Sequence, residues 1–247
     1  MFWYILLATF LASIVSLLLV AFSLFYKSFF EKYSFHMVAF AAGALLTTGF
    51  LDTMPEAIEA SEKSFLTITI FIALFFLVEK VLLGMHHHHP KKSEEEKLRM
   101  PLSFLLFGDA LHNFIDGVSI ASTFLVSFPL GVVTSAAVFV HEIPHELGDF
   151  GILIHMGYER LKVLGFNALT GLGAIFGAIG GFYLSSKIEG LLPILLSLTT
   201  ANFVYLALSD LIPEVQERSK KDGSFLTALS FLLGILFISL LTSFVPE

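Results

Sequence analysis

The chain begins with one long apolar stretch that decides the class of fold. Residues 1–25 have the sequence MFWYILLATFLASIVSLLLVAFSLF, in which no residue is charged, and the first basic residue is Lys27. A helix needs about 20 mostly apolar residues to cross the hydrocarbon core of a bilayer. The stretch also lacks the basic region that opens a cleaved signal peptide, so we expect a retained first transmembrane helix.

The same composition continues along the chain. Of its 247 residues, 56% are hydrophobic and 14% are charged, whereas about a quarter are charged in an ordinary soluble domain. Apolar runs bounded by charged or turn-forming residues predict eight membrane spans. These spans lie near 3–25, 35–56, 65–84, 101–126, 129–156, 161–185, 191–213 and 225–245. We therefore expect an all-α, polytopic membrane protein that forms one transmembrane domain over residues 1–247.

The basic residues indicate how the spans are oriented. Of the 14 Lys and Arg residues, all but Lys63 and Lys187 fall in the first, third, fifth and seventh loops. Basic residues concentrate in cytoplasmic loops, so both termini should lie outside a cell membrane. The third loop, at about 85–100, would then be cytoplasmic, and its tract His86–His89 either binds released metal weakly or is a passive solvated segment.

Charge and cysteine content exclude several functions. The net charge of −7 argues against nucleic acid as a partner, because nucleic-acid binding requires a basic face. The chain has no cysteine, which excludes disulfides, thiolate metal ligands and a cysteine nucleophile. We therefore expect the protein to lie in a lipid bilayer and to bind a small ligand.

A short motif occurs twice. Residues 52–56 and 210–214 both have the pattern D-x-x-P-E, and each is followed by Ser-Phe-Leu-Thr, at 64–67 and 224–227. The two spans involved would cross the membrane in opposite directions, which predicts a 3+2+3 arrangement with inverted repeats, as in many secondary transporters. Asp52 and Asp210 could then mark the two mouths of one pathway. Alternatively, both motifs are ordinary helix ends that stop at a proline.

Spans four and five carry ionisable residues, which are costly at membrane depth and therefore suggest function. Each span has a pair spaced by four residues, His112 with Asp116 and His141 with His145, so each pair lies on one helical face within reach of one cation. Imidazole, carboxylate and amide ligands without sulfur suit Zn²⁺, Fe²⁺ or Mn²⁺. The candidate ligands are His112, Asn113, Asp116, His141, Glu142 and His145. The residues that line the pathway or orient the histidines would include Asp109, Glu146, Asp149 and His155. Alternatively, His155 is a solvated residue at the end of a helix.

The same residues allow a different function. Residues 141–145 fit H-E-x-x-H, in which two histidines bind zinc and the glutamate is a general base, so an intramembrane metalloprotease is the alternative. Pro144 lies between the histidines and would distort the helix that holds them. Substituting Glu142 separates the two: a protease would lose hydrolysis and keep its metal, whereas a transporter would lose metal handling. A membrane metal sensor without transport is a third possibility.

The paired motifs resemble those of a known family. The stretches HNFIDG at 112–117 and HEIPHELGDF at 141–150 are similar to the fourth- and fifth-span signatures of the ZIP (Zrt/Irt-like) metal transporters, in particular the subfamily with H-E-x-P-H-E-x-G-D. The resemblance implies eight spans, dimers, and alternating access that takes up Zn²⁺, or Fe²⁺, Mn²⁺ or Cd²⁺, as substrate rather than as a catalytic cofactor.

The resemblance also implies a binuclear centre between spans four and five. His112, Asp116 and His145 would hold one ion with His141 beside it, and Asn113, Glu142 and His145 would border the second. Some family members place a carboxylate in span six at the second site, but residues 167–171 contain none. The occupancy of the second site therefore stays open.

Overall fold

The computed structural model describes residues 1–247 except 24, 85–101, 223 and 245–247, and the described residues form helices without strands. The α-helices are α1 (Phe2–Ser23), α2 (Lys27–Thr47), α3 (Met54–Ala60), α4 (Ser64–Gly84), α6 (Leu102–Val126), α7 (Phe128–His155), α8 (Arg160–Ser185), α9 (Leu191–Tyr205), α10 (Ile212–Asp222) and α11 (Ser224–Phe244). Two π-helical segments, η1 (Thr48–Thr53) and η2 (Leu206–Leu211), join α2 to α3 and α9 to α10. The tract His86–His89 and the third loop lie outside the described residues.

Each predicted span falls on a helix or on a continuous series of helices. The second series runs from 27 to 60 and the seventh from 191 to 222, so both are longer than predicted. Pro55 and Pro213 lie in the first turn of α3 and α10, where a missing N–H costs little and the helix therefore continues. Pro144 likewise lies inside α7, which continues to His155.

Five of the described helical stretches are long and apolar enough to cross a membrane. They are Phe2–Ser23, Lys32–Ala60, Arg160–Ser185, Leu191–Glu217 and Phe225–Phe244. The polar residues within α6 and α7 make these two helices less apolar, although each has more than 20 residues. The protein is therefore an all-helical, polytopic membrane protein, and a total of eight crossings stays a prediction.

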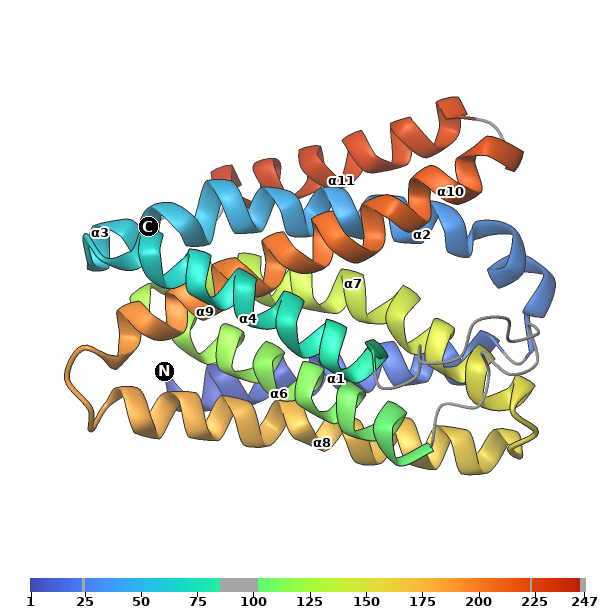
Figure 1. The fold of residues 1–247 in the computed structure, drawn as a ribbon, viewed down its shortest axis with the longest axis horizontal. Helices are drawn as coiled ribbons and strands as arrows, with labels where there is room; N and C mark the ends of the chain where they lie inside the picture. The colour runs from blue at the N-terminus through green and yellow to red at the C-terminus, as the bar shows by residue number, and fades with distance from the viewer. Residues whose placement is uncertain (24, 85–101, 223, 245–247) are drawn as a thin grey trace.

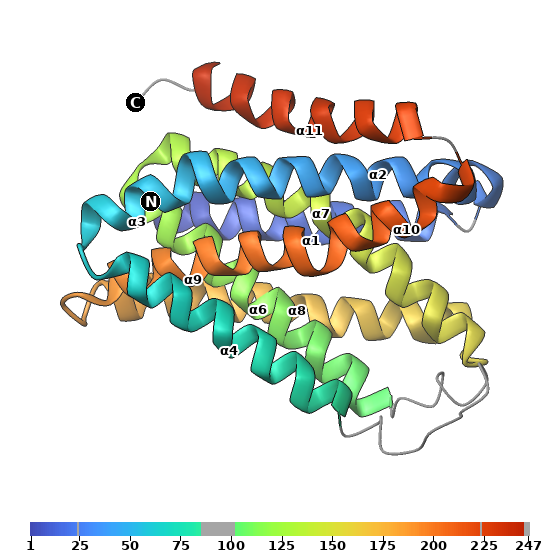
Figure 2. The same cartoon turned by 45° about the horizontal axis from the view of Figure 1, so that its top comes forward.

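The long helices lie side by side in one bundle (Figures 1 and 2). Helix α7 contacts α1, α2, α6, α8 and α11, and α6 contacts α7, α8 and α9, so these two helices lie inside the bundle. The start of α1, the α3–α4 turn and the α8–α9 turn are at one end, and the α7–α8 turn is at the other (Figure 1). The polar residues of α6 and α7 are thereby placed within the protein.

Glycines bring two pairs of helices into backbone contact. A Cβ atom on Gly117 of α6 would lie 1.8 Å from the carbonyl oxygen of Ala174 on α8, and one on Gly177 would lie 1.9 Å from that of Phe114. Helices α2 and α11 meet in the same way at Gly43 and Gly234. In a bilayer such close packing replaces the hydrophobic effect as the force that joins helices.

The two copies of the D-x-x-P-E motif fold alike. Asp52 is the fifth of six residues in η1, and Asp210 is the fifth of six in η2. Segment η1 packs against α9 and η2 packs against α2, so each copy contacts the helix that leads into the other. π-Helical segments occur frequently at functional sites. The inverted symmetry of the surrounding three-helix groups stays a prediction.

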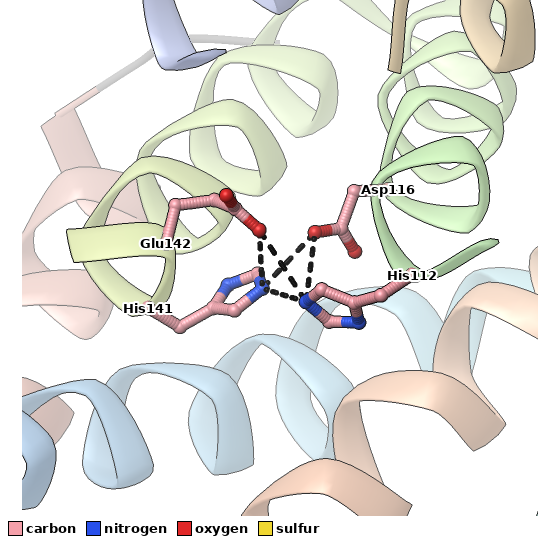
Figure 3. Close-up of side chains that lie close together, drawn as sticks. All are labelled: His112, Asp116, His141 and Glu142. Atoms are coloured by element: carbon pink, nitrogen blue, oxygen red, sulfur yellow. Dashed lines mark hydrogen bonds and ion pairs between the residues drawn. The ribbon is translucent and has the colours of Figure 1, made fainter. Parts of the chain in front are cut away.

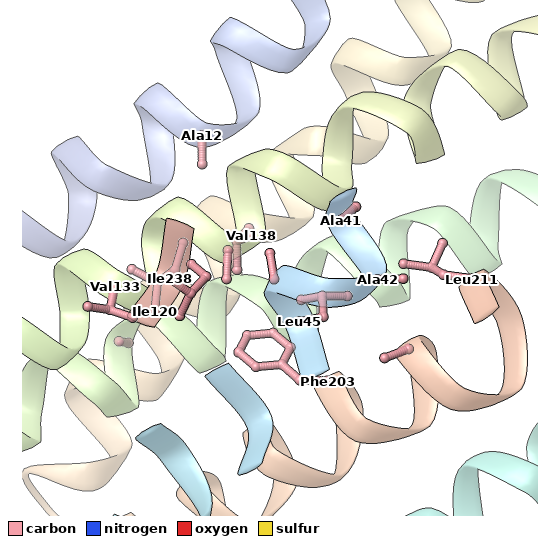
Figure 4. Packing of buried hydrophobic residues seen from close by; sticks show 14 of the residues in the cluster. Ala12, Ala41, Ala42, Leu45, Ile120, Val133, Val138, Phe203, Leu211 and Ile238 are labelled. Atoms are coloured by element: carbon pink, nitrogen blue, oxygen red, sulfur yellow. The ribbon is translucent and has the colours of Figure 1, made fainter. Parts of the chain in front are cut away.

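A cluster of buried apolar residues forms a core within the bundle (Figure 4). It joins α1, α2, α6, α7, α9 and α11 through buried side chains that include Leu45, Ile120, Val138, Phe203 and Ile238. Ile120 lies one turn beyond Asp116 on α6, and the ring of Phe203 lies 6.4 Å from that of His141. The core thus borders the polar residues and holds α6 and α7 in register.

Candidate metal centre

Two histidines and two carboxylates from α6 and α7 converge inside the bundle (Figure 3). His112 and Asp116 lie one turn apart on α6, and His141 and Glu142 are consecutive on α7. The Nε2 atom of His112 lies 3.3 Å from Nε2 of His141, 3.5 Å from Oδ2 of Asp116 and 3.3 Å from Oε1 of Glu142. We call these four residues the metal centre.

The spacing of the four ligand atoms fits one tetrahedral ion. Nε2 of His141 lies 3.0 Å from Oδ2 of Asp116 and 3.7 Å from Oε1 of Glu142. A tetrahedron with zinc–ligand bonds of about 2.0–2.1 Å has edges of about 3.3–3.4 Å. Five of its six edges here therefore measure 3.0–3.7 Å, and a zinc ion can be placed between the four atoms with small movements.

Hydrogen bonds alone do not account for this arrangement. Nε2 of His112 and Nε2 of His141 each have three close neighbours, but one ring nitrogen carries at most one proton. Among the described residues, neither carboxylate oxygen of Glu142 has a hydrogen-bond partner. His141, Glu142 and Asp116 are buried, so an uncompensated carboxylate there would be costly. A divalent cation bound between the four atoms would compensate these carboxylates.

Partners outside the centre fix two of its ligands. Nδ1 of His141 lies 3.0 Å from the carbonyl oxygen of Ala137, a contact that directs Nε2 toward the other ligands. Asn202 on α9 donates from Nδ2 to Oδ1 of Asp116 at 3.2 Å. Asn202 is absent from the sequence-based site, and the only signal for it is an amide inside an apolar span. It connects the metal centre to a third helix.

Two of the six predicted ligands, Asn113 and His145, are not among the four residues of the metal centre. The amide of Asn113 donates to Oδ1 of Asp109 at 2.9 Å, on its own helix. The ring of His145 packs on that of His112 with centroids 4.5 Å apart, but its ligand atom groups with Asp109 and Asp149 rather than with the metal centre. The ligand role of both residues stays a prediction, and His145 has a ring contact with a residue of the metal centre, His112.

Glu146 is also buried and has a partner from α8. Its carboxylate accepts a short hydrogen bond from Nδ2 of Asn167, which lies in the span-six stretch that lacks a carboxylate. Asn167 thus provides an amide, hydrogen-bonded to Glu146, in the stretch where the family resemblance leads us to look for a carboxylate. Asn167 is the second functional candidate that the sequence interpretation did not include.

The remaining pathway candidates differ in exposure. Asp52 is buried, and its Oδ1 accepts a hydrogen bond from Thr242 on α11 at 3.0 Å. Asp210 is exposed and has His145 and His112 among its electrostatic neighbours. His155 is the exposed last residue of α7. The structure thus places Asp210 within electrostatic range of His145 and His112.

Comparisons with known proteins show similarity to zinc and metal transporters. A family model described as ZIP zinc transporter matches residues 84–242. Zinc transporter ZIP6 of Homo sapiens is 35% identical over 147 residues, which cover 57% of this chain and 20% of that protein. Metal cation symporter ZIP14 of Xenopus tropicalis is 40% identical over 152 residues, covering 57% of this chain and 32% of the relative. Zinc transporter ZIP13 of Pongo abelii is 29% identical over 229 residues, or 85% of this chain and 67% of the relative. The chain therefore spans less than a third of the length of ZIP6 and ZIP14.

Proposed function

Because this chain belongs to the ZIP zinc transporter family, we propose that it carries a divalent metal cation, zinc first, across a membrane through the metal centre. The observation that carries the proposal is the tetrahedral spacing of His112, Asp116, His141 and Glu142, buried between α6 and α7. Fe²⁺, Mn²⁺ and Cd²⁺ are the alternative substrates that nitrogen and oxygen ligands accept. The cation is cargo, so no catalytic chemistry is required of these residues.

The proposed direction is uptake into the cytoplasm by alternating access. The distribution of Lys and Arg supports placing the Asp210 motif at the cytoplasmic side and the Asp52 motif outside. Asp210 is exposed and electrostatically coupled to His112 and His145, whereas Asp52 is buried. This difference supports a form in which the metal centre is connected to the cytoplasmic side and closed from the outside.

We further propose a binuclear centre and a homodimer, both of which the family resemblance implies, in the cell membrane. A second ion bordered by Asn113, Glu142 and His145 requires the amide of Asn113 to turn away from Asp109, to which it now donates. Oε1 of Glu142 belongs to the metal centre, whereas Oε2 has no hydrogen-bond partner among the described residues and would be available to a second ion. The protease alternative has no support, since the relatives are zinc and metal transporters.

The experiment is zinc uptake into proteoliposomes that contain the purified chain and an internal zinc-sensitive dye, with no peptide substrate. We expect saturable uptake by the wild type and background uptake by His141→Ala, since His141 contributes a buried ligand atom to the centre. The control is His36→Ala, which removes an imidazole of α2 that contacts Ser230 of α11. It should transport like the wild type.

Two results would overturn the proposal. One is uptake by wild-type vesicles no faster than uptake by vesicles without protein, although the chain binds zinc. The other is saturable uptake by His141→Ala at the wild-type rate, which would remove the metal centre from the pathway.

A further inference from the structure

A second group of ligand atoms lies one helical turn from the metal centre. Asp109 precedes His112 on α6, and Asp149 follows His145 on α7 by one turn. One ligand atom from each of Asp109, His145 and Asp149 lies within 4.8 Å of the others. We call these three residues the second cluster. It lies toward the start of α6 and the end of α7, on the side of the α7–α8 turn.

The spacing within the second cluster allows one cation. Three atoms that are mutually within 4.8 Å all lie within about 2.8 Å of a common point, whereas zinc bonds to nitrogen and oxygen are about 2.0–2.2 Å long. Side-chain movements of less than about 1 Å therefore bring all three atoms to bonding distance. Two carboxylates and one imidazole suit zinc, iron or manganese.

The local charge favours a cation. Glu146 is buried and has Asp109 and Asp149 among its electrostatic neighbours, so a third carboxylate adds negative charge near the cluster. In the described part of the chain, no Lys or Arg forms an ion pair with any of the three. Carboxylates gathered at this depth repel one another unless a positive charge compensates them.

Unpartnered polar atoms provide a second, independent observation. Asn167 is only 1% exposed, and its Nδ2 donates to Glu146, but its Oδ1 has no hydrogen-bond partner among the described residues. Nδ1 of His145 is buried and equally without a partner there. Thr170 lies one turn from Asn167 and interacts with Asp109, so this face of α8 lies next to the cluster. An amide oxygen is an acceptable ligand for a divalent cation.

We propose that Asp109, His145 and Asp149 bind a divalent cation at a site separate from the metal centre, with the carbonyl oxygen of Asn167 as a further ligand. The site differs from the second ion of the binuclear centre, which Asn113, Glu142 and His145 would border. The rings of His145 and His112 are 4.5 Å apart, so His145 connects the two positions. Binding at the second cluster goes beyond the proposed function, because it requires no transport.

The test is the number of zinc ions bound by the purified full chain in detergent, measured by equilibrium dialysis and metal analysis. We expect Asp109→Asn/Asp149→Asn to bind one zinc ion fewer than the wild type. His145 is left unchanged in this variant because it also contacts His112. The matched control is Glu159→Gln, an exposed carboxylate near the α7–α8 turn, which should bind as many ions as the wild type. Equal zinc content in the double variant and the wild type would overturn the proposal.

A measurement on the wild type guards against a variant that fails to fold. Crystals grown with Cd²⁺ should show an anomalous scattering peak between Asp109 and Asp149, in addition to a peak at the metal centre. A peak at the metal centre alone would overturn the second site. Failure of the proposed function is a separate result, since it consists of absent uptake in vesicles whatever number of ions the chain binds.

Discussion

At the scale of single residues, Asp116 is the carboxylate that the surrounding protein orients most fully. Its Oδ1 accepts a hydrogen bond from Asn202 at 3.2 Å, and its Oδ2 lies 3.0 Å from Nε2 of His141. Asn202 thereby occupies one oxygen and leaves the other for an ion. Partners of this kind fix the orientation of a ligand and strengthen its bond to metal.

We predict that Asn202→Ala weakens zinc binding by about 10- to 100-fold, the usual effect of losing a residue that orients a metal ligand. Isothermal titration of zinc into the purified protein measures the affinity. Ser197→Ala is the control, because Ser197 is buried on the same helix but bonds only to the carbonyl of Pro193. Equal affinities of Asn202→Ala and the wild type would contradict this role.

The sequence allows part of the centre to be predicted. The spacing of His112 and Asp116 places both on one face of a helix whatever the tertiary structure, and they do converge. The contact between Asp116 and Asn202 joins residues that are 86 positions apart, so no local pattern indicates it. Whether His145 turns toward the metal centre or toward Asp109 depends on its rotamer, which spacing does not determine.

At the scale of helices, the contact between α6 and α8 depends on glycines. The glycines of α8 differ in what surrounds them. Gly173 and Gly177 press on backbone carbonyls of α6, whereas a Cβ atom on Gly171 or Gly180 would meet no other atom within 4 Å. The difference arises because the glycines lie on different faces of α8, and the number of glycines in a span does not show which face each one is on.

We predict that Gly177→Ala lowers stability by about 1–3 kcal/mol, because its Cβ must displace the carbonyl of Phe114 and overpacking has costs of this size. Gly180→Ala on the same helix should leave stability unchanged or raise it slightly, since a helical Gly→Ala change in open space is favourable. Thermal unfolding in detergent compares the two. An unfolding midpoint of Gly177→Ala at or above that of Gly180→Ala would show that the backbone contact is not a constraint.

The repeated motif could be located from sequence, but its local geometry could not. Pro55 and Pro213 cannot donate a hydrogen bond to the carbonyl four residues earlier, which predicts a helix end. Instead each helix passes through a π segment and continues. The N–H of Met54 donates to the carbonyl of Gly49, and that of Ile212 donates to the carbonyl of Ala207, the five-residue spacing of a π-helix. The position of the proline alone does not predict this wider winding.

At the scale of the whole molecule, the turns with few basic residues and a turn in a basic-rich loop lie at opposite ends of the bundle, as the positive-inside rule predicts. The turns that contain Lys63 and Lys187 are at one end, and the turn before Lys162 is at the other (Figure 1). The apolar runs therefore predicted where the described helices lie, whereas the number of membrane crossings and their orientation stay predictions. The pairing of α6 with α8 and of α2 with α11 could not be predicted, because it depends on glycine contacts between distant segments.

We predict that Lys63→Cys and Lys187→Cys react with a membrane-impermeant maleimide on intact cells, whereas Lys162→Cys reacts only after permeabilisation. All three side chains are exposed, and the chain has no native cysteine, so each variant carries a single thiol. Labelling on a gel measures the reaction. The reverse pattern would invert the orientation and with it the direction of uptake.

The contact between α6 and α8 repeats along both helices. Ala110, Phe114 and Val118 meet Gly173, Gly177 and Gly181 in turn, so each residue is four positions after the one before. A shift of half a turn would set side chains against backbone, but a shift of four residues, about 6 Å, would bring carbonyls opposite glycines again. Sliding of these two helices past one another would therefore be favoured in steps of a whole turn rather than continuously.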